Sequence, residues 1–289
     1  MSKQDLSGKV AVVTGASRGA GKGIAVALGS HGATVYVTGR TVNEGDADLP
    51  GTVAHTAELV TAAGGQGIAA VCDHADDGQV ADLFDRVRSE QGGLDILVNN
   101  ATFLHDQLIE PGPFWEKPLD MTRVFDVGIR SGYVASWYAA PLLVARGGGL
   151  VVFTSSFGAR CYMHGPAYGA QKVSVDKFAA DMAVDFKPHN VATASIWMGM
   201  LQTDRTRRVM AREPEKYAGF WEIAETPEFT GHIISALYND PKRAERSGQT
   251  VVGAELAQEY GITEADGRVP PSHREMLGAP VQAHPAVVQ

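Results

Sequence analysis

Short runs of apolar, often β-branched residues alternate along this chain with longer segments whose apolar residues recur at helical spacing. The runs are apolar throughout rather than at every second position, which is typical of strands buried on both faces. Because parallel strands need crossover connections, we predict an α/β fold: a single doubly wound, Rossmann-type domain whose parallel sheet carries helices on both faces. The predicted strands cover residues 10–14, 33–38, 68–72, 94–99, 150–154, 191–196 and 250–252.

Two stretches do not fit this alternation. Residues 199–226 form a long interval without a strand, and we predict that they are an insert that covers a substrate. Residues 256–289 are rich in proline and are predicted to be a covering tail rather than a separate domain, with a frayed chain end as the alternative. No linker or change of composition divides the rest of the chain, so residues 1–255 are predicted to form one domain.

Composition excludes several classes of protein. The chain is 44% hydrophobic and 20% charged, which lies outside the range of disordered proteins. Its net charge of −8 provides no electrostatic footprint for nucleic acid. Cys72 and Cys161 are too few for a disulfide framework, which favours a reducing compartment.

The sequence also lacks signals for a membrane or a metal. The longest apolar stretch, residues 133–145, is interrupted by Ser136 and Pro141 and is shorter than the ~20 residues of a spanning helix. The polar N-terminus has no secretory apolar region, and the histidines show no metal-binding spacing. We therefore predict a cytoplasmic protein without a metal, a membrane span or a nucleic-acid partner.

A glycine-rich turn directly follows the first predicted strand. Gly15, Gly19 and Gly21 allow backbone amides to approach a pyrophosphate, and the next helix directs its positive dipole end at the same place. Ser17 and Arg18 lie within this turn and are assigned to the same ligand. The turn predicts a dinucleotide site, and the alternative is an ordinary tight turn.

The end of the second strand indicates which dinucleotide is bound. An acidic residue there contacts the ribose hydroxyls in NAD-binding domains, whereas this strand ends in Gly39 and Arg40. Together with Arg18, Arg40 supplies space and positive charge for a 2′-phosphate. The sequence thus predicts NADP(H) rather than NAD(H), unless Arg40 is simply solvated.

Polar residues at the ends of two further strands lie at the same carboxyl edge, where ligands bind in such sheets. Asp73 follows the third strand and is predicted either to accept a hydrogen bond from adenine or to cap the next helix. Asn99 and Ala101 end the fourth strand and are also assigned to the cofactor.

Tyr168 and Lys172 are four residues apart at the start of a predicted helix, on its inward face. A phenol with a pKa of ~10 exchanges protons at neutral pH only if its phenolate is stabilised, and a nearby ammonium does this. Ser155, at a strand end, is predicted to hold a substrate oxygen, although the adjacent Ser156 is the alternative. The competing interpretation is a core tyrosine with a lysine extended to solvent.

These residues resemble the motifs of the short-chain dehydrogenase/reductase family. Residues 14–21, Asn99–Ala101, Ser155 and the Tyr168 and Lys172 pair stand in the family's order and spacing, over about residues 5–255. The resemblance implies hydride transfer between NADP(H) and a carbonyl or alcohol, with Tyr168 as acid/base. It also implies that Lys172 binds the nicotinamide ribose, that Thr203 binds the carboxamide, and that the protein is a homo-oligomer, dimeric or tetrameric, formed through its fourth and fifth helices.

Three positions depart from the family pattern. Gly128 stands where the family commonly has an asparagine that completes a proton relay to the lysine, Thr102 replaces a glycine, and Met198 replaces a proline. Residues 114–118, 127–130, 259–263 and 266–268 resemble one subgroup, that around the family's dehydrogenase/reductase member one. We therefore interpret Gly128 as a subgroup trait rather than as an inactivating loss.

The substrate and the exact activity are left open by the sequence. In the predicted insert, Arg205, Arg207 and Arg208 either select an anionic substrate or form a solvated face, and His105 and Trp115 either line the opposite wall or belong to the core. The alternative function is a non-catalytic dinucleotide-binding sensor or scaffold, and an isomerase or dehydratase that uses the same tyrosine is a third reading.

Overall fold

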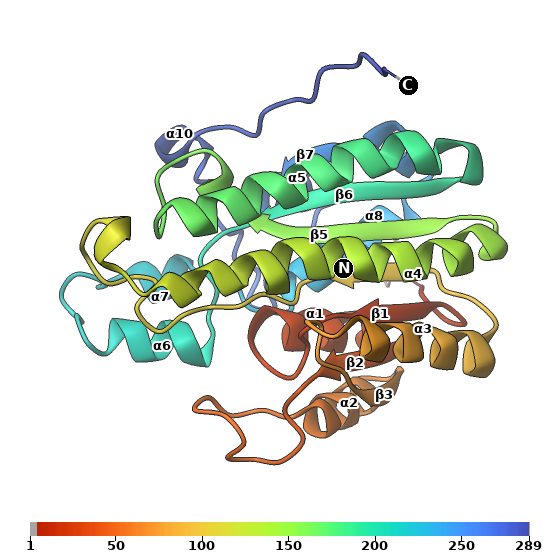
Figure 1. The fold of residues 1–289 in the computed structure, drawn as a ribbon, viewed down its shortest axis with the longest axis horizontal. Helices are drawn as coiled ribbons and strands as arrows, with labels where there is room; N and C mark the ends of the chain where they lie inside the picture. Colours follow the sequence, from red (N-terminus) through yellow and green to blue (C-terminus); the bar gives the residue numbers. More distant parts are fainter. Residues whose placement is uncertain (1–4, 289) are drawn as a thin grey trace.

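The computed structural model describes residues 5–288, which contain one sheet of seven strands. The strand order is β3-β2-β1-β4-β5-β6-β7, and all neighbouring strands are parallel (Figure 1). The predicted fold class is confirmed, and no predicted strand end lies more than two residues from the observed one. The strands are β1 (Val10–Val13), β2 (Thr34–Gly39), β3 (Gln66–Val71), β4 (Ile96–Asn99), β5 (Gly149–Ser156), β6 (Val191–Met198) and β7 (Gln249–Val252).

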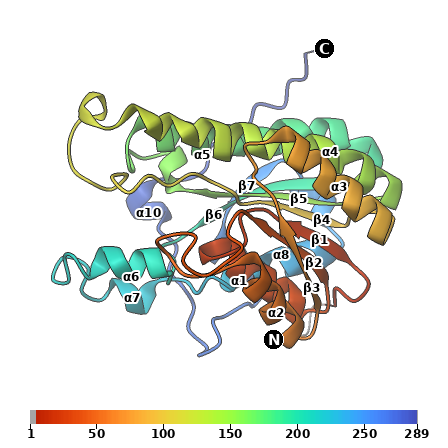
Figure 2. The same cartoon turned by 60° about the horizontal axis from the view of Figure 1, so that its bottom comes forward.

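Helices cover both faces of the sheet (Figure 2). One face carries α1 (Gly19–Ser30), α2 (Val53–Ala62) and α8 (Phe229–Asn239). The other carries α3 (Asp77–Gln91), α4 (Ser131–Arg146) and α5 (Pro166–Phe186). Successive strand residues point to opposite faces, so each strand supplies both layers and must be apolar throughout.

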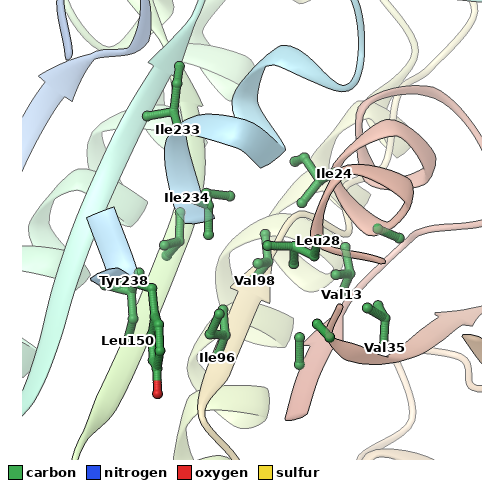
Figure 3. Packing of buried hydrophobic residues seen from close by; sticks show 14 of the residues in the cluster. Val13, Ile24, Leu28, Val35, Ile96, Val98, Leu150, Ile233, Ile234 and Tyr238 are labelled. Atoms are coloured by element: carbon green, nitrogen blue, oxygen red, sulfur yellow. The ribbon is translucent and has the colours of Figure 1, made fainter. Parts of the chain in front are cut away.

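The layer beneath α1 and α8 forms the larger buried cluster (Figure 3). Val13 and Val98 of the central strands contact this layer, together with Leu28 of α1 and Ile234 of α8, and all four side chains are fully buried. Burying a side chain of this size stabilises the fold by about 1.5–3 kcal/mol. This packing holds the central strands rigid, and their ends position the candidate site.

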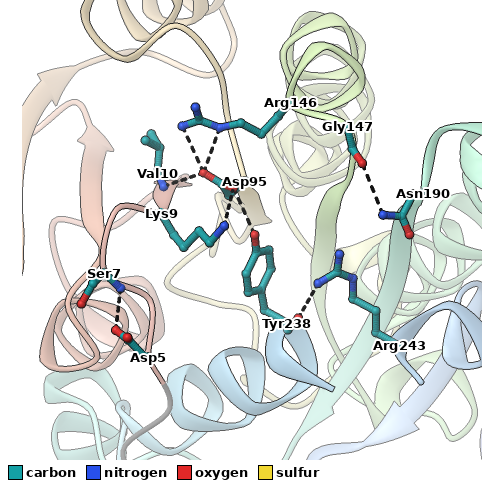
Figure 4. A network of polar contacts seen from close by, with 10 residues as sticks. All are labelled: Asp5, Ser7, Lys9, Val10, Asp95, Arg146, Gly147, Asn190, Tyr238 and Arg243. Carbon is teal, nitrogen blue, oxygen red and sulfur yellow. Dashed lines mark hydrogen bonds and ion pairs between the residues drawn. The ribbon is translucent and has the colours of Figure 1, made fainter. Parts of the chain in front are cut away.

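A buried carboxylate joins several elements at the amino ends of the strands (Figure 4). Asp95 accepts hydrogen bonds from the Val10 N–H (3.0 Å) and the Tyr238 hydroxyl (3.1 Å). It also forms ion pairs with Lys9 (3.6 Å) and Arg146 (3.3 Å). A buried charge is costly unless it is fully partnered, so this network fixes β1, β4, α4 and α8 at the edge opposite the site.

Local sequence sets the ends of the helices that flank the site. The carboxylate of Asp76 caps α3 by accepting hydrogen bonds from the N–H groups of Gly78 and Gln79. Pro166 is the first residue of α5, where its missing N–H leaves no bond unmade. The start of α5 is therefore defined, which fixes the side chains carried by its first two turns.

The two irregular stretches contain short helices. Residues 199–226 include α6 (Asp204–Met210) and α7 (Phe220–Ile223), which extend beyond the sheet in Figures 1 and 2. The predicted domain limit at residue 255 falls inside α9 (Gly253–Glu259), and α10 (Arg274–Leu277) follows; the domain limits stay a prediction. Further short helical turns are Phe114–Glu116, Leu119–Thr122, Phe125–Arg130, Phe157–Ala159, Lys187–His189 and Arg243–Arg246.

Candidate active site

A cavity of about 550 Å³, the sheet-edge cavity, opens at the carboxyl ends of the strands. This is the edge at which ligands bind in doubly wound sheets. The cavity is lined by the predicted residues Gly15, Ser17, Arg18, Gly19, Gly21, Arg40, Asp73, Ala101, Ser155, Tyr168, Lys172 and Thr203. The structure thus brings together residues that lie far apart in the sequence.

The glycine turn has the shape that a bound diphosphate requires. Gly15 and Gly19 have φ angles of 65° and 57°, which favour glycine. A Cβ atom on Gly21 would lie 2.4 Å from the Gly15 carbonyl oxygen, so a side chain would fill the turn. The Asn100 amide donates to the carbonyl oxygens of Thr14 and Gly15 and holds this shape. The turn therefore fits the diphosphate of a dinucleotide.

The prediction for Asn99 is corrected by the structure. Its amide donates to the Ser136 hydroxyl of α4 (2.9 Å), and Asn99 is not among the residues that line the cavity. Asn100, the next residue, lines the cavity instead. Successive residues of an extended strand end point in opposite directions, so two adjacent asparagines cannot share one role.

Three charged side chains meet at the end of the cavity near β2. Arg18 donates to the carbonyl oxygens of Pro50 and Gly51 and to the Thr41 hydroxyl. Burial lowers the pKa of Arg18, and the neighbouring charges of Arg205 and Arg40 act in the same direction. Cations are therefore concentrated at this end of the cavity.

Arg40 is held less tightly than Arg18. Its side chain is 63% exposed and lies 3.9 Å from the carboxylate of Asp73. Asp73 accepts a hydrogen bond from the Ala75 N–H and does not cap α3, since Asp76 has that position. The capping alternative for Asp73 is therefore wrong, and both side chains remain directed at the cavity.

Tyr168 and Lys172 project from the first two turns of α5 toward the ends of β4 and β5. The Lys172 amine donates to the Thr154 carbonyl oxygen (3.3 Å) and lies 5.3 Å from the centroid of the Tyr168 ring. Both side chains line the sheet-edge cavity, and Lys172 is buried. A lysine extended to solvent is thereby excluded.

The structure places Ser156, not Ser155, against the tyrosine. The hydroxyls of Ser156 and Tyr168 are 3.0 Å apart. Ser155 is fully buried, and its hydroxyl donates to the Lys172 carbonyl oxygen (3.4 Å) in the backbone of α5. Consecutive residues of β5 point to opposite faces, so only one serine reaches the phenol. The geometry thus favours the alternative, Ser156, as the hydroxyl beside the phenol, and which serine holds the substrate oxygen stays a prediction.

The pKa of Tyr168 differs from the sequence-based expectation, which was a pKa lowered by the neighbouring Lys172. Burial raises the pKa of Tyr168, and the hydrogen bond to Ser156 only partly opposes this effect. The Lys172 amine, which is directed at the Thr154 carbonyl and lies over the ring, does not offset this rise in the Tyr168 pKa. Burial lowers the pKa of Lys172 to about 8, against the attraction of Asp176.

Asp176 is a residue that the sequence analysis missed. It lies one turn after Lys172 on α5, and its carboxylate accepts hydrogen bonds from the Ser195 hydroxyl (2.6 Å) and the Trp197 indole (2.9 Å). The signal was the four-residue spacing of Tyr168, Lys172 and Asp176, which places all three on one helix face. Asp176 is thus a half-buried carboxylate whose charge attracts the ammonium group of Lys172.

Neighbouring side chains fill the space beside Gly128 in which a larger residue would place its side chain. Gly128 has a φ of 143°, and a Cβ atom there would lie 3.1 Å from Gln171 Cγ and 3.2 Å from the Thr102 hydroxyl. The Gln171 amide donates to the Gly128 carbonyl oxygen (3.3 Å). The space that a side chain at this position would need is therefore taken by Gln171 and Thr102. The absence of a side chain at Gly128 leaves no empty gap there.

The predicted insert closes at a narrow neck. Glu225 pairs its backbone with Met200 and Gln202, and its carboxylate accepts from the Gly199 N–H (3.0 Å). Burial raises the pKa of Glu225 to about 8, and the nearby carboxylate of Glu264 acts in the same direction. The neck thus contains a buried acid next to residues that line the cavity.

The arginines of the insert contact residues inside and outside it. Arg207 lies 4.4 Å from the ring centroid of Trp221, and Arg208 donates to the Asp48 carbonyl oxygen. Arg205 lines the sheet-edge cavity and lies 3.5 Å from the Asp106 carboxylate. Thr203 caps α6 through the Thr206 N–H. Only Arg205 of the three therefore faces the cavity.

The tail contacts both the neck and the end of β5. Glu264 accepts hydrogen bonds from the N–H (2.7 Å) and hydroxyl (2.6 Å) of Thr226. The rings of His273 and Phe157 are in edge contact, 6.0 Å between centroids. These contacts hold the tail near the insert.

A second cavity, the apolar chamber, adjoins the first. It has a volume of about 610 Å³, and its walls come from residues 103–125, before α4, and residues 162–170, at the start of α5. The predicted wall residues His105 and Trp115 both line it, and Trp115 is 72% exposed rather than part of the core. Tyr168 lines both cavities.

Comparisons with known proteins agree with this site. A family model described as short chain dehydrogenase matches residues 9–214. Dehydrogenase/reductase SDR family member 1 of Homo sapiens is 38% identical over 274 residues, 91% of this chain and 85% of that protein. The 7alpha-hydroxysteroid dehydrogenase of Escherichia coli (strain K12) is 30% identical over 212 residues, 73% and 78% of the two chains.

Solved structures with a similar fold include a protein of the same kind as one of these relatives. A 7 alpha-hydroxysteroid dehydrogenase complexed with NADH and 7-oxo glycochenodeoxycholic acid has a TM-score of 0.72 at 27% identity, covering 86% of this chain and 94% of that one. Fold and site define a Rossmann-type oxidoreductase that uses a nicotinamide dinucleotide. The chain belongs to the short-chain dehydrogenase family, and its similarity to member 1 confirms the resemblance to that subgroup. In residues 5–288, no helix is long and apolar enough to cross a bilayer.

Proposed function

We propose that this protein is an NADP(H)-dependent oxidoreductase that transfers hydride between the nicotinamide and the carbonyl or alcohol carbon of a small molecule. The observation that carries this proposal is the hydrogen-bonded pair of hydroxyls, Tyr168 and Ser156, beside the buried amine of Lys172. A phenol and a second hydroxyl together can hold one substrate oxygen and exchange a proton with it. The bound cofactor supplies the hydride donor or acceptor.

Each side chain then has a distinct role. In the reducing direction, Tyr168 donates its proton to the carbonyl oxygen, and Ser156 donates a hydrogen bond to the same oxygen, which stabilises the negative charge that develops there. Lys172 stabilises the phenolate that remains, because its positive charge lies over the ring. Ser155 is a positioning residue, since it binds the backbone of α5 at Lys172.

The cationic end of the sheet-edge cavity supports NADP(H) over NAD(H). Arg40 is exposed at the end of β2, and Arg18 and Arg205 add positive charge beside it. A 2′-phosphate is dianionic or nearly so at neutral pH and gains charge-assisted hydrogen bonds from arginine. We assign the diphosphate to residues 15–21, the adenine to Asp73 and the carboxamide to Thr203.

One experiment tests the function against a non-catalytic dinucleotide-binding role. NADPH oxidation is measured with a panel of aldehydes and ketones, for the wild type and Tyr168→Phe. We expect turnover that Tyr168→Phe reduces by at least about 10²-fold while cofactor affinity is retained. Cofactor binding without turnover across the panel, in both proteins, contradicts the proposal and favours a sensor or scaffold.

We also propose that the protein is a homo-oligomer formed through α4 and α5. These helices expose Tyr133 (52%), Trp137 (61%) and Val173 (51%), which are large apolar side chains at the surface. Light scattering measures the mass in solution, and Trp137→Lys is expected to shift it toward the monomer. A monomeric wild type contradicts this assembly.

A further inference from the structure

The apolar chamber is continuous with the site of proton transfer. It shares Phe103, His164 and Tyr168 with the sheet-edge cavity, so the phenol lies at the junction of the two cavities. A substrate whose oxygen reaches Tyr168 from the chamber side must therefore place the rest of its structure in the chamber. The occupant of the chamber and the substrate of the reaction are then the same molecule.

The chamber walls are mainly apolar and solvent-accessible. Phe114, Trp115 and Leu119 are 60%, 72% and 83% exposed and surround the hollow. Aromatic and aliphatic side chains around a hollow of several hundred Å³ are typical of sites that bind the hydrocarbon part of a ligand. The walls thus select an apolar body next to the reacting carbonyl.

One cation interrupts this apolar lining. The Lys117 amine lies in the chamber wall, is half-buried, and donates to the Leu108 carbonyl oxygen (3.2 Å). No ion pair of Lys117 is found within the described residues, and the carboxylate of Asp120, three residues further along the chain, pairs with His105 (3.3 Å). A lysine without a counter-ion in an apolar wall is complementary to an anionic group on the ligand.

The charge of Lys117 influences His164, a residue in contact with Tyr168. His164 has a left-handed backbone (φ 60°), and its ring lies 5.0 Å from that of Tyr168. Burial lowers the pKa of His164, and the charges of Lys117 and Lys172 lower it further, so the imidazole is neutral at pH 7. Lys117 is therefore the cation that the chamber offers to a ligand.

We propose that the substrate is an amphiphilic carbonyl compound whose apolar body fills the chamber, whose carbonyl oxygen reaches Tyr168 and Ser156, and whose carboxylate pairs with Lys117. This inference rests on the proposed oxidoreductase function. It makes Lys117 a specificity-determining residue. The carboxylate replaces the missing counter-ion, and the ion pair gains strength because the chamber is only partly open to water.

The test compares an ω-benzoyl alkanoate with its methyl ester, which has the same apolar body without the charge. Values of kcat/KM are measured with NADPH for the wild type, Lys117→Met and Lys117→Arg. Lys177→Met is the matched control, because it removes one exposed lysine of α5 outside the chamber. We expect the wild type to prefer the acid roughly tenfold, and Lys117→Met to abolish the preference while Lys117→Arg and Lys177→Met keep it.

Two outcomes overturn the inference, and a third separates it from the proposed function. If Lys117→Met lowers kcat/KM equally for acid and ester, Lys117 only supports the structure through Leu108. If Lys117→Met leaves both values of kcat/KM as in the wild type, Lys117 does not contact the carboxylate. Calorimetric binding of both compounds to the protein loaded with NADP⁺, which cannot donate a hydride to a carbonyl, gives a readout without turnover. Lys117-dependent binding of the acid with no reduction of either compound supports the site and contradicts the reaction.

Discussion

Ser156 and Tyr168 come from different elements, the end of β5 and the first turn of α5, yet their hydroxyl oxygens are 3.0 Å apart. Ser155, one residue earlier, instead bonds to the backbone of α5. The two serines therefore perform separable tasks, and single substitutions should affect different measured quantities.

Ser156→Ala is expected to lower kcat/KM for carbonyl reduction by about 10²–10³-fold with little change in stability, because it removes a donor to the developing oxyanion. Ser155→Ala is the matched control. It should lower the free energy of unfolding by about 1 kcal/mol and leave most of the activity. Steady-state kinetics and urea unfolding measure the two effects. A larger loss of kcat/KM in Ser155→Ala than in Ser156→Ala would support Ser155 as the residue that holds the substrate oxygen.

The pKa of Lys172, lowered by burial to about 8, predicts an alkaline limit to activity. The amine carries its charge below this pKa and loses it above, so the support of the phenolate is present at neutral pH and disappears as the pH rises. We expect kcat for reduction to be constant below about pH 7 and to fall above about pH 8. Lys172→Arg, which stays charged, should retain a lower activity without this fall. If kcat falls at high pH in the same way in the wild type and Lys172→Arg, the fall arises from another group.

Arg40→Ala tests the cofactor preference. Because Arg40 is exposed and, among residues 5–288, its one ion pair is the long contact with Asp73, its removal should leave the fold intact. We expect kcat/KM for NADPH to fall by about tenfold or more while the value for NADH changes little. The NADH value is the internal control, since a structural defect lowers both. A wild type that prefers NADH contradicts the NADP(H) proposal.

Glu225 makes the stability of the protein depend on pH. Its pKa is raised from 4.5 to about 8 by burial, so the folded state retains a proton that the unfolded chain has released between these values. The free energy of unfolding should therefore fall as the pH rises through this window, by up to about 1.4 kcal/mol per pH unit.

The isosteric variant Glu225→Gln removes this dependence and keeps an acceptor for the Gly199 N–H. Relative to the wild type, it should become more stable as the pH rises from 5 to 8, measured by urea unfolding at each pH. Glu222→Gln, at an exposed position of α7, is the control and should follow the wild type. A constant difference between Glu225→Gln and the wild type contradicts the buried, protonated acid.

Features set by local sequence were predictable. The strands of continuous apolar residues, the glycine turn between residues 15 and 21, and Pro166 at the start of α5 each follow from short-range sterics or burial, and each was found at its place. The face of α5 that carries Tyr168 and Lys172 was predictable for the same reason, because helical spacing fixes which residues share a side.

Choices between neighbouring or distant groups were not predictable. Asn100 rather than Asn99 lines the cavity, and Ser156 rather than Ser155 lies against the phenol, because the phase of a strand end depends on how the strand is seated in the sheet. The direction of the Tyr168 pKa also required the structure, since burial outweighs a lysine whose amine is directed elsewhere.

The sequence by itself determined the alternation of strands and helices, the glycine turn and the tyrosine and lysine pair, because each depends on residues within a few positions of one another. The tertiary structure alone decided which serine meets the phenol, how Gln171 and Thr102 fill the space at Gly128, and that Lys117 stands in an apolar wall beside Tyr168. These relationships join segments that are distant along the chain, and only the packing of the sheet against its helices brings such segments within contact.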